Sequence, residues 1–241
     1  MAQAPIDPAR LRQAGAGLPW LRGLDSVRLE RLNALAARFV SEKTITPVHD
    51  LQLNEVQRLR LALLCCLPLL EFGGDGLRGW SELIVYPGAF RVRHQRFDDH
   101  GVAHEDVEDL AGEAWERGPV ILSWADVRAD IAEPFEGYCV AVHEIAHKLD
   151  ALDGGMDGTP PLPQAWRRQW VSDFQRAFDA LCAQVDAGRE TAIDPYAGES
   201  PEEFFAVCSE YHFSAPALLH AACPAVAAHL ARFYGAPPFA H

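Results

Sequence analysis

Apolar residues recur at helical spacing in the first third of the chain. From Asp25 to Val40 they occupy positions 27, 29, 32, 35, 36 and 39, which predicts an amphipathic surface helix. From Leu51 to Leu70 the sequence becomes apolar on nearly all sides, which predicts a longer helix inside the core. Pro68 should end or bend that helix, because proline removes a backbone hydrogen bond.

The hydrophobic pattern changes to short β-type runs in the middle of the chain. Leu83–Tyr86 and Val120–Trp124 are predicted strands, and Phe90–His94 alternates between apolar and polar residues. Pro87 and Gly88 lie between the runs 83–86 and 90–94. These two runs are therefore predicted to be strands joined by a turn. The sequence therefore predicts a small sheet in a chain that is otherwise helical.

Helical periodicity returns after Tyr138. One helix should end near Gly154, a long helix is expected from about Gln164 to Ala187 with Gly188 as its stop, and two or three more should follow Ser200. Breaks are expected near Pro216 and Pro224. The whole pattern predicts a mainly helical α+β fold in a single domain, residues 1–241, with a helical N-terminal lobe at about 1–75 and a core at about 76–241.

Composition narrows the class of protein. The chain has 241 residues, 49% of them hydrophobic, which is enough for a large core. Its net charge of −13 argues against direct binding of nucleic acid or anionic membranes. The N-terminus lacks a secretory pattern and the longest apolar run, 61–72, is too short to span a bilayer, so a cytoplasmic protein is expected. Six cysteines without a C-x-x-C pair are expected to be free, mostly buried thiols.

A five-residue motif carries the candidate chemistry: His143-Glu144-Ile145-Ala146-His147. In a helix, residues four apart lie on one face with β-carbons about 5–6 Å apart, so both imidazoles can bind one metal ion. Glu144 is rotated by about one hundred degrees from His143 and can reach a bound water as a general base. The competing interpretation is that the motif arose by chance and that the two histidines are simply hydrogen-bonded. The apolar segment Tyr138–Val142 before the motif favours a buried helix, and buried polar groups need a bonding partner.

A catalytic zinc ion usually has three protein ligands, so a third must come from elsewhere. The downstream candidates are Glu199, Glu202, Glu203 and Glu210. Ser200 and Pro201 are typical of a helix start, which places Glu203 at the third helical position. There it either closes a capping box onto Ser200 or ligates the metal, and the local pattern favours neither.

Several segments together are similar to one known family. They are His143–Asp150, Asp153-Gly154, Pro160–Pro163, Asp194–Tyr196, Pro201–Tyr211, Val85–Pro87 and Gly112–Trp124. On these residues the chain resembles the Mlc titration factor A family of bacterial zinc peptidases, which are gluzincin-type and similar in metal-site layout to the anthrax lethal factor catalytic domain. The resemblance implies a zincin-like fold and hydrolysis of peptide bonds in a peptide or protein substrate by a zinc-activated water.

The resemblance also implies individual roles: one Zn²⁺ ion bound by His143, His147 and Glu203, Glu144 as the base, and Tyr196 as a catalytic tyrosine that donates to the oxyanion. Family members are associated with sequestering a glucose-responsive transcriptional repressor of the Mlc type. A non-catalytic zinc module that binds such a regulator is therefore the alternative function.

Three neighbouring residues have open roles. Asp150 either orients a ligand histidine or bonds the loop that follows, and Glu210 is a candidate to support the site. The family more often has aromatic residues at the positions of Ile145 and His212. Ile145 is a conservative change toward the core, and His212 is expected to be an ordinary surface or hydrogen-bonded histidine, with approach to the metal as the alternative.

Overall fold

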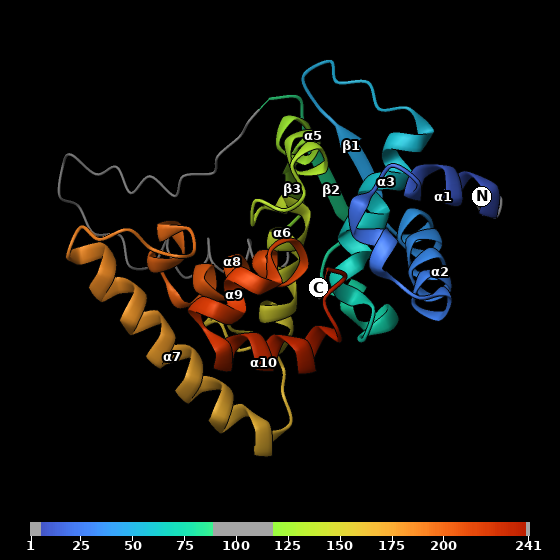
Figure 1. The fold of residues 1–241 in the computed structure, drawn as a ribbon. Helices are drawn as coiled ribbons and strands as arrows, with labels where there is room; N and C mark the ends of the chain where they lie inside the picture. The colour runs from blue at the N-terminus through green and yellow to red at the C-terminus, as the bar shows by residue number, and fades with distance from the viewer. Residues whose placement is uncertain (1–5, 89–117, 240–241) are drawn as a thin grey trace, which may run out of the picture.

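A computed structural model of the chain describes residues 6–88 and 118–239. The fold is mainly helical with one small sheet, so the predicted α+β class is confirmed (Figure 1). The N-terminal helices are α1 (Pro8–Gly15), α2 (Ser26–Glu42) and α3 (Glu55–Cys66). The later helices are α5 (Trp124–Ala132), α6 (Val140–Asp150), α7 (Gln164–Asp186), α8 (Pro201–Ser214), α9 (Pro216–Ala222) and α10 (Pro224–Tyr234).

The two long N-terminal helices match the predicted ones. Asp25 caps α2 by accepting a hydrogen bond from the Arg28 N–H at 2.8 Å. Helix α3 starts four residues later than predicted, because Asn54 and Gln57 form a capping box that fixes its first turn. It ends at Cys66, and Pro68 lies in the short 3₁₀ turn that follows, Leu67–Leu69.

The sheet has three parallel strands in the order β1-β2-β3: β1 (Thr44–Pro47), β2 (Glu82–Tyr86) and β3 (Val120–Ser123). Strands β2 and β3 were predicted, and the prediction is confirmed. Strand β1 was not, because its four residues carry no readable alternation. The strand predicted at 90–94 lies outside the described residues.

Glycine and proline mark the boundaries of the later helices as predicted. A 3₁₀ turn, Ala151–Asp153, extends α6 to Gly154, which has a φ of 92°, and Gly188 after α7 has a φ of 63°. Pro216 and Pro224 are the first residues of α9 and α10. Among the described residues, no helix is both long and apolar enough to cross a bilayer. All six cysteines are free, and four of them are buried, as expected.

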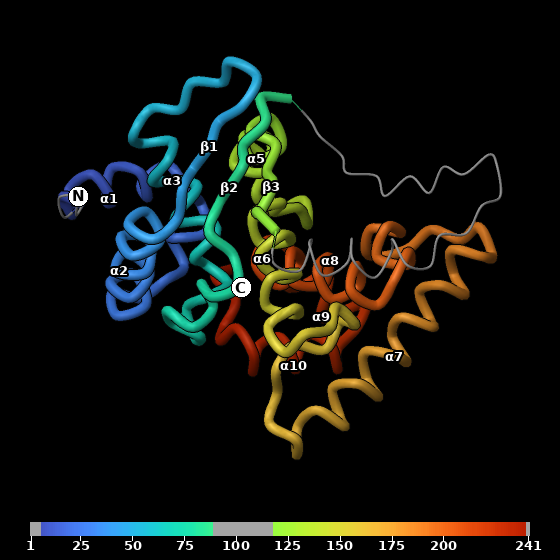
Figure 2. Tube along the Cα trace, turned by 180° about the vertical axis from the view of Figure 1, so that it is seen from behind, coloured from blue at the N-terminus to red at the C-terminus, as the bar shows by residue number. Residues whose placement is uncertain are grey.

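Helix α6 lies in the middle of the molecule, between the sheet and the C-terminal helices (Figure 2). It packs against β3, α3 and α8, and α8 is buried from Glu203 to Ser214. A polar chain inside the core ties α7 to α10: the Trp166 Nε1–H donates to His229 Nδ1 at 2.7 Å, and His229 Nε2 lies 3.0 Å from Asp173 Oδ2. Helices α6 and α8, which carry the charged candidate residues, pack directly against each other.

Candidate metal centre

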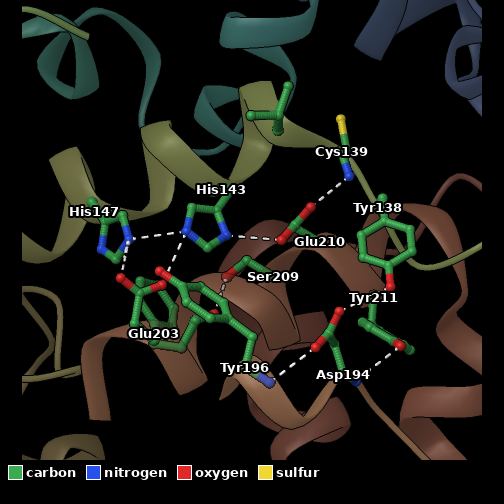
Figure 3. Close-up of polar contacts among 12 residues, drawn as sticks. Tyr138, Cys139, His143, His147, Asp194, Tyr196, Glu203, Ser209, Glu210 and Tyr211 are labelled. Atoms are coloured by element: carbon green, nitrogen blue, oxygen red, sulfur yellow. Dashed lines mark hydrogen bonds and ion pairs between the residues drawn. The ribbon is translucent and has the colours of Figure 1, made fainter. Parts of the chain in front are cut away.

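Two histidines lie one turn apart on the same face of α6. The opposite face, with Val142, Ile145 and Leu149, is fully buried, so the helix can enter the core only with His143 and His147 directed toward α8. Ile145 thus fills the core position expected of it. The two Nε2 atoms are 3.2 Å apart, close enough to bind a single ion (Figure 3).

Glu203 reaches these histidines from the first turn of α8. Its backbone N–H donates to Ser200 Oγ at 3.3 Å, which is the first half of a capping box. Its carboxylate does not return to Ser200: Oε2 lies 3.1 Å from His143 Nε2, and Oε1 lies 3.5 Å from His147 Nε2. Glu203 therefore combines a capped backbone with a side chain that faces the histidines.

The three side chains fit a zinc ion. Ligand atoms 2.0–2.2 Å from zinc at the corners of a tetrahedron are about 3.3–3.6 Å apart. The two Nε2 atoms are 3.2 Å apart, slightly closer than this, and one ligand atom from each of the three side chains lies within 4.8 Å of the others. Glu203 Oε2 is buried and makes no well-aligned hydrogen bond within the described part of the chain. A bound cation would satisfy that oxygen, and imidazole and carboxylate are ligands that zinc accepts.

Charges around the cluster favour a cation. Burial alone lowers the pKa of His143, but the carboxylates of Glu210 and Glu203 outweigh it and raise that pKa well above its ordinary value. Burial alone raises the pKa of Glu203, but the contacts of its carboxylate with His143 and His147 lower that pKa below its ordinary value. The cluster holds an ionised carboxylate beside a strongly basic imidazole, so metal binding would displace a proton.

Tyr196 and Glu144 lie beside this cluster. Tyr196 is in a 3₁₀ turn, Pro195–Gly198, with its ring centroid 6.2 Å from that of His143. Burial, the charge of Glu203 and a hydrogen bond to Glu203 raise the pKa of Tyr196 above its ordinary value, so its hydroxyl stays protonated. Glu144 is close enough to Tyr196 to contribute to this shift. The structure thus brings His143, His147, Glu203 and Tyr196 together, and Glu144 is the residue that follows His143 on α6.

The turn that carries Tyr196 is held by three side chains that sequence reasoning missed. Asp194 accepts hydrogen bonds from the Tyr196 N–H at 2.9 Å and from the Tyr138 hydroxyl at 2.8 Å, and its own N–H donates to the Tyr211 hydroxyl at 3.1 Å. Gly137 has a φ of 92°, and a β-carbon there would lie 2.7 Å from the Tyr211 ring. The Asp-Pro start of the turn was a readable capping signal, but its distant partners were not.

Two of the three residues with open roles, Asp150 and His212, are outside the candidate ligand group formed by the described residues. Asp150 Oδ2 accepts a hydrogen bond from the Gly158 N–H at 2.8 Å, which is the loop contact that one alternative predicted. Burial, with Asp157 and Glu202 nearby, raises the pKa of Asp150 to about 7. His212 is buried against Phe213 and Tyr234 and not at the surface, and its hydrogen bond to the Gly235 backbone makes it the hydrogen-bonded histidine of the expectation.

Burial and the nearby Arg28 lower the pKa of His212 to about 3, which keeps its imidazole neutral. The burial follows from its position within α8, which is buried at every residue from Glu203 to Ser214. Among the described residues, the candidate metal ligands form one group, which contains His143, His147 and Glu203 and excludes His212. The third residue with an open role, Glu210, lies 2.8 Å from His143 Nδ1.

Known proteins resemble this chain over nearly its full length. Residues 1–235 match the family described as glucose-regulated metallo-peptidase M90. A protein of Serratia proteamaculans (strain 568), named Mlc titration factor A, is 38% identical over 231 residues, which cover 95% of this chain and 87% of that protein. A protein of the same name from Yersinia pestis (strain Pestoides F) is 38% identical over 226 residues, 92% of this chain and 83% of its own length.

Proposed function

Because this chain belongs to the glucose-regulated metallo-peptidase M90 family, we propose that it hydrolyses peptide bonds with one zinc ion held by His143, His147 and Glu203. The observation that carries the proposal is that one ligand atom from each of these three side chains lies within 4.8 Å of the others. Three protein ligands leave one position of a tetrahedral zinc ion for water. The substrate class is a peptide or protein.

The chemistry divides between the metal and the protein. Zinc, when bound, supplies Lewis-acid activation of a water molecule and of the scissile carbonyl. Glu144 takes the proton from the attacking water and delivers it to the leaving amine, so the same carboxylate serves as base and then as acid. Its place next to His143 on α6 supports this role.

Tyr196 provides the hydrogen bond for the oxyanion that forms when water attacks the carbonyl. Two features support this role. Its raised pKa keeps the phenol protonated as a donor, and Asp194 fixes the turn on which it stands. The donor is therefore positioned before the substrate binds, at little cost in reorganisation.

The first test is metal content alongside peptide hydrolysis. Protein purified without added zinc should contain about one zinc ion per chain, as the tetrahedral ligand set requires, and should cleave members of a mixed peptide library followed by mass spectrometry. A chelator should abolish cleavage and added zinc should restore it. Zinc-free protein after purification, with no uptake on titration, would contradict the proposed site.

Tyr196→Phe should lower kcat by about 10²-fold, because removing one oxyanion donor costs roughly that factor. Zinc content should stay at the parent level, since the hydroxyl is not among the candidate ligands. Steady-state kinetics with one cleaved peptide and metal analysis of the same preparation make the test. Turnover equal to that of the parent would reject the role of Tyr196.

The names of the relatives favour a second candidate function. They are called Mlc titration factor A, so this chain could serve as a zinc-containing module that binds a transcriptional repressor of the Mlc type without cleaving it. Full-strength repressor binding by Glu144→Gln, with no peptide cleaved by the parent, would favour the module. Cleavage by the parent that Glu144→Gln abolishes would favour the peptidase.

A further inference from the structure

A buried carboxylate on α8, Glu210, joins His143 to the start of α6 (Figure 3). Its Oε1 lies 2.8 Å from His143 Nδ1, and its Oε2 accepts a hydrogen bond from the Cys139 N–H at 2.6 Å. Both carboxylate oxygens are therefore engaged, one by the imidazole and one by the backbone. A carboxylate accepts and does not donate, so the proton of this contact belongs to Nδ1 of His143.

The spacing along α8 explains why two carboxylates meet one imidazole. Glu203 and Glu210 are seven residues apart, which is two helical turns and hence one face of the helix. Glu203 approaches the Nε2 edge of His143, and Glu210 approaches the Nδ1 edge. With Nδ1–H committed to Glu210, Nε2 is the nitrogen that faces Glu203 and His147, and it offers its lone pair to a metal ion once its own proton has left.

Glu210 is itself fixed by the helix whose histidine it contacts. The first N–H groups of a helix have no partner inside it and carry a partial positive charge. Cys139, at the N-cap position of α6, makes no side-chain cap, and Glu210 accepts from its N–H instead. Asp130 on α5 does the same for the next residue, accepting from the Val140 N–H at 2.8 Å.

His143 and His147 differ in whether Nδ1 has a hydrogen-bond partner. His147 Nδ1 is buried and has no hydrogen-bond partner within residues 6–88 and 118–239, whereas His143 Nδ1 is held by Glu210. A ligand histidine that donates its second N–H to a carboxylate is fixed in tautomer and ring orientation, and its metal-binding nitrogen becomes more basic.

We propose that Glu210 is a positioning residue of the metal centre: it locks His143 in the Nδ1–H tautomer and aims Nε2 at the zinc ion. The inference rests on the zinc site of the proposed function. It adds to the three ligands a fourth side chain, which acts through His143. It also makes α8 the source of both a ligand and the group that orients another ligand.

Glu210→Gln is the variant that separates the contact of Glu210 with His143 from its contact with the Cys139 N–H. Its amide oxygen can still accept from the Cys139 N–H, but the NH₂ group then faces His143 Nδ1 and favours the Nε2–H tautomer, which cannot bind zinc. We expect the zinc Kd to rise about 10–100-fold, measured by competition with a chromophoric chelator. Zinc binding by Glu210→Gln at the parent Kd would overturn the proposal.

Asp130→Asn is the matched control. It makes the same carboxylate-to-amide replacement at the neighbouring backbone N–H of the same helix start, and within the described part of the chain its hydrogen-bond partner is that N–H and not a histidine. Its zinc Kd should equal that of the parent. An equal loss of affinity in both variants would mean that the two carboxylates act only by capping α6, which would also overturn the proposal.

A measurement on the parent protein covers the case in which Glu210→Gln does not fold. Long-range ¹H–¹⁵N spectra of the zinc-loaded protein should show His143 protonated at Nδ1, and an Nδ1 without a proton would refute the inference. A parent that binds no zinc would instead contradict the proposed function. The two failures are therefore distinguishable.

Discussion

Glu144→Gln is expected to lower kcat for peptide hydrolysis by about 10²–10⁴-fold, the range that removal of a general base produces. The amide has the size and shape of the carboxylate but cannot accept a proton from water. Zinc should remain bound at the parent level, because Glu144 is not part of the group formed by His143, His147 and Glu203.

The measurement pairs steady-state hydrolysis of one peptide with metal content of the same preparation. Glu136→Gln is a suitable control, since it makes the same change of charge at an exposed position just before α6. It should hydrolyse the peptide like the parent. Full activity of Glu144→Gln would reject the general-base role, while loss of zinc from it would show that Glu144 supports the ligands instead.

Most helices could be predicted because their signals are local. Helices α2 and α7 carry long apolar periodicity, and Pro216 and Pro224 mark the starts of α9 and α10. Strand β1 could not be predicted, since it is defined by pairing with β2, where Thr44 lies opposite Glu82. Four residues are too few to show a period, and the partner strand is nearly forty residues away in sequence.

The candidate site likewise contains some contacts that the sequence predicts and others that depend on packing. The relation of His143 to His147 follows from helix geometry alone, whereas the contacts of Glu203 and Glu210 depend on how α8 packs against α6. The first turn of a helix suits both a capping glutamate and one that reaches across to a neighbour, so sequence alone left Glu203 undecided. The burial of His212 is equally a matter of packing, because a histidine has no fixed preference for the surface.

Glu203→Ala is expected to lose most of its zinc on dialysis. Zinc-binding free energies of about 10–16 kcal/mol shared among three or four ligands give about 2.5–5 kcal/mol for each, so losing one should weaken binding by about 10²-fold or more. The loss also removes a negative charge from beside two imidazoles that lie 3.2 Å apart. Peptide hydrolysis should fall with the zinc content and should recover in part when excess zinc is added.

Two variants separate ligation from helix capping. Ser200→Ala removes the hydroxyl that accepts from the Glu203 N–H, so it should cost about 1 kcal/mol in the free energy of unfolding while zinc is retained. Glu202→Ala removes the adjacent carboxylate, which lies outside the ligand group, and should also keep zinc. If Glu203→Ala kept zinc at the parent affinity and lost only stability, capping would be its role and the third ligand would have to come from another residue. The carboxylate lies against both histidines rather than against Ser200, so ligation is the outcome that the geometry favours.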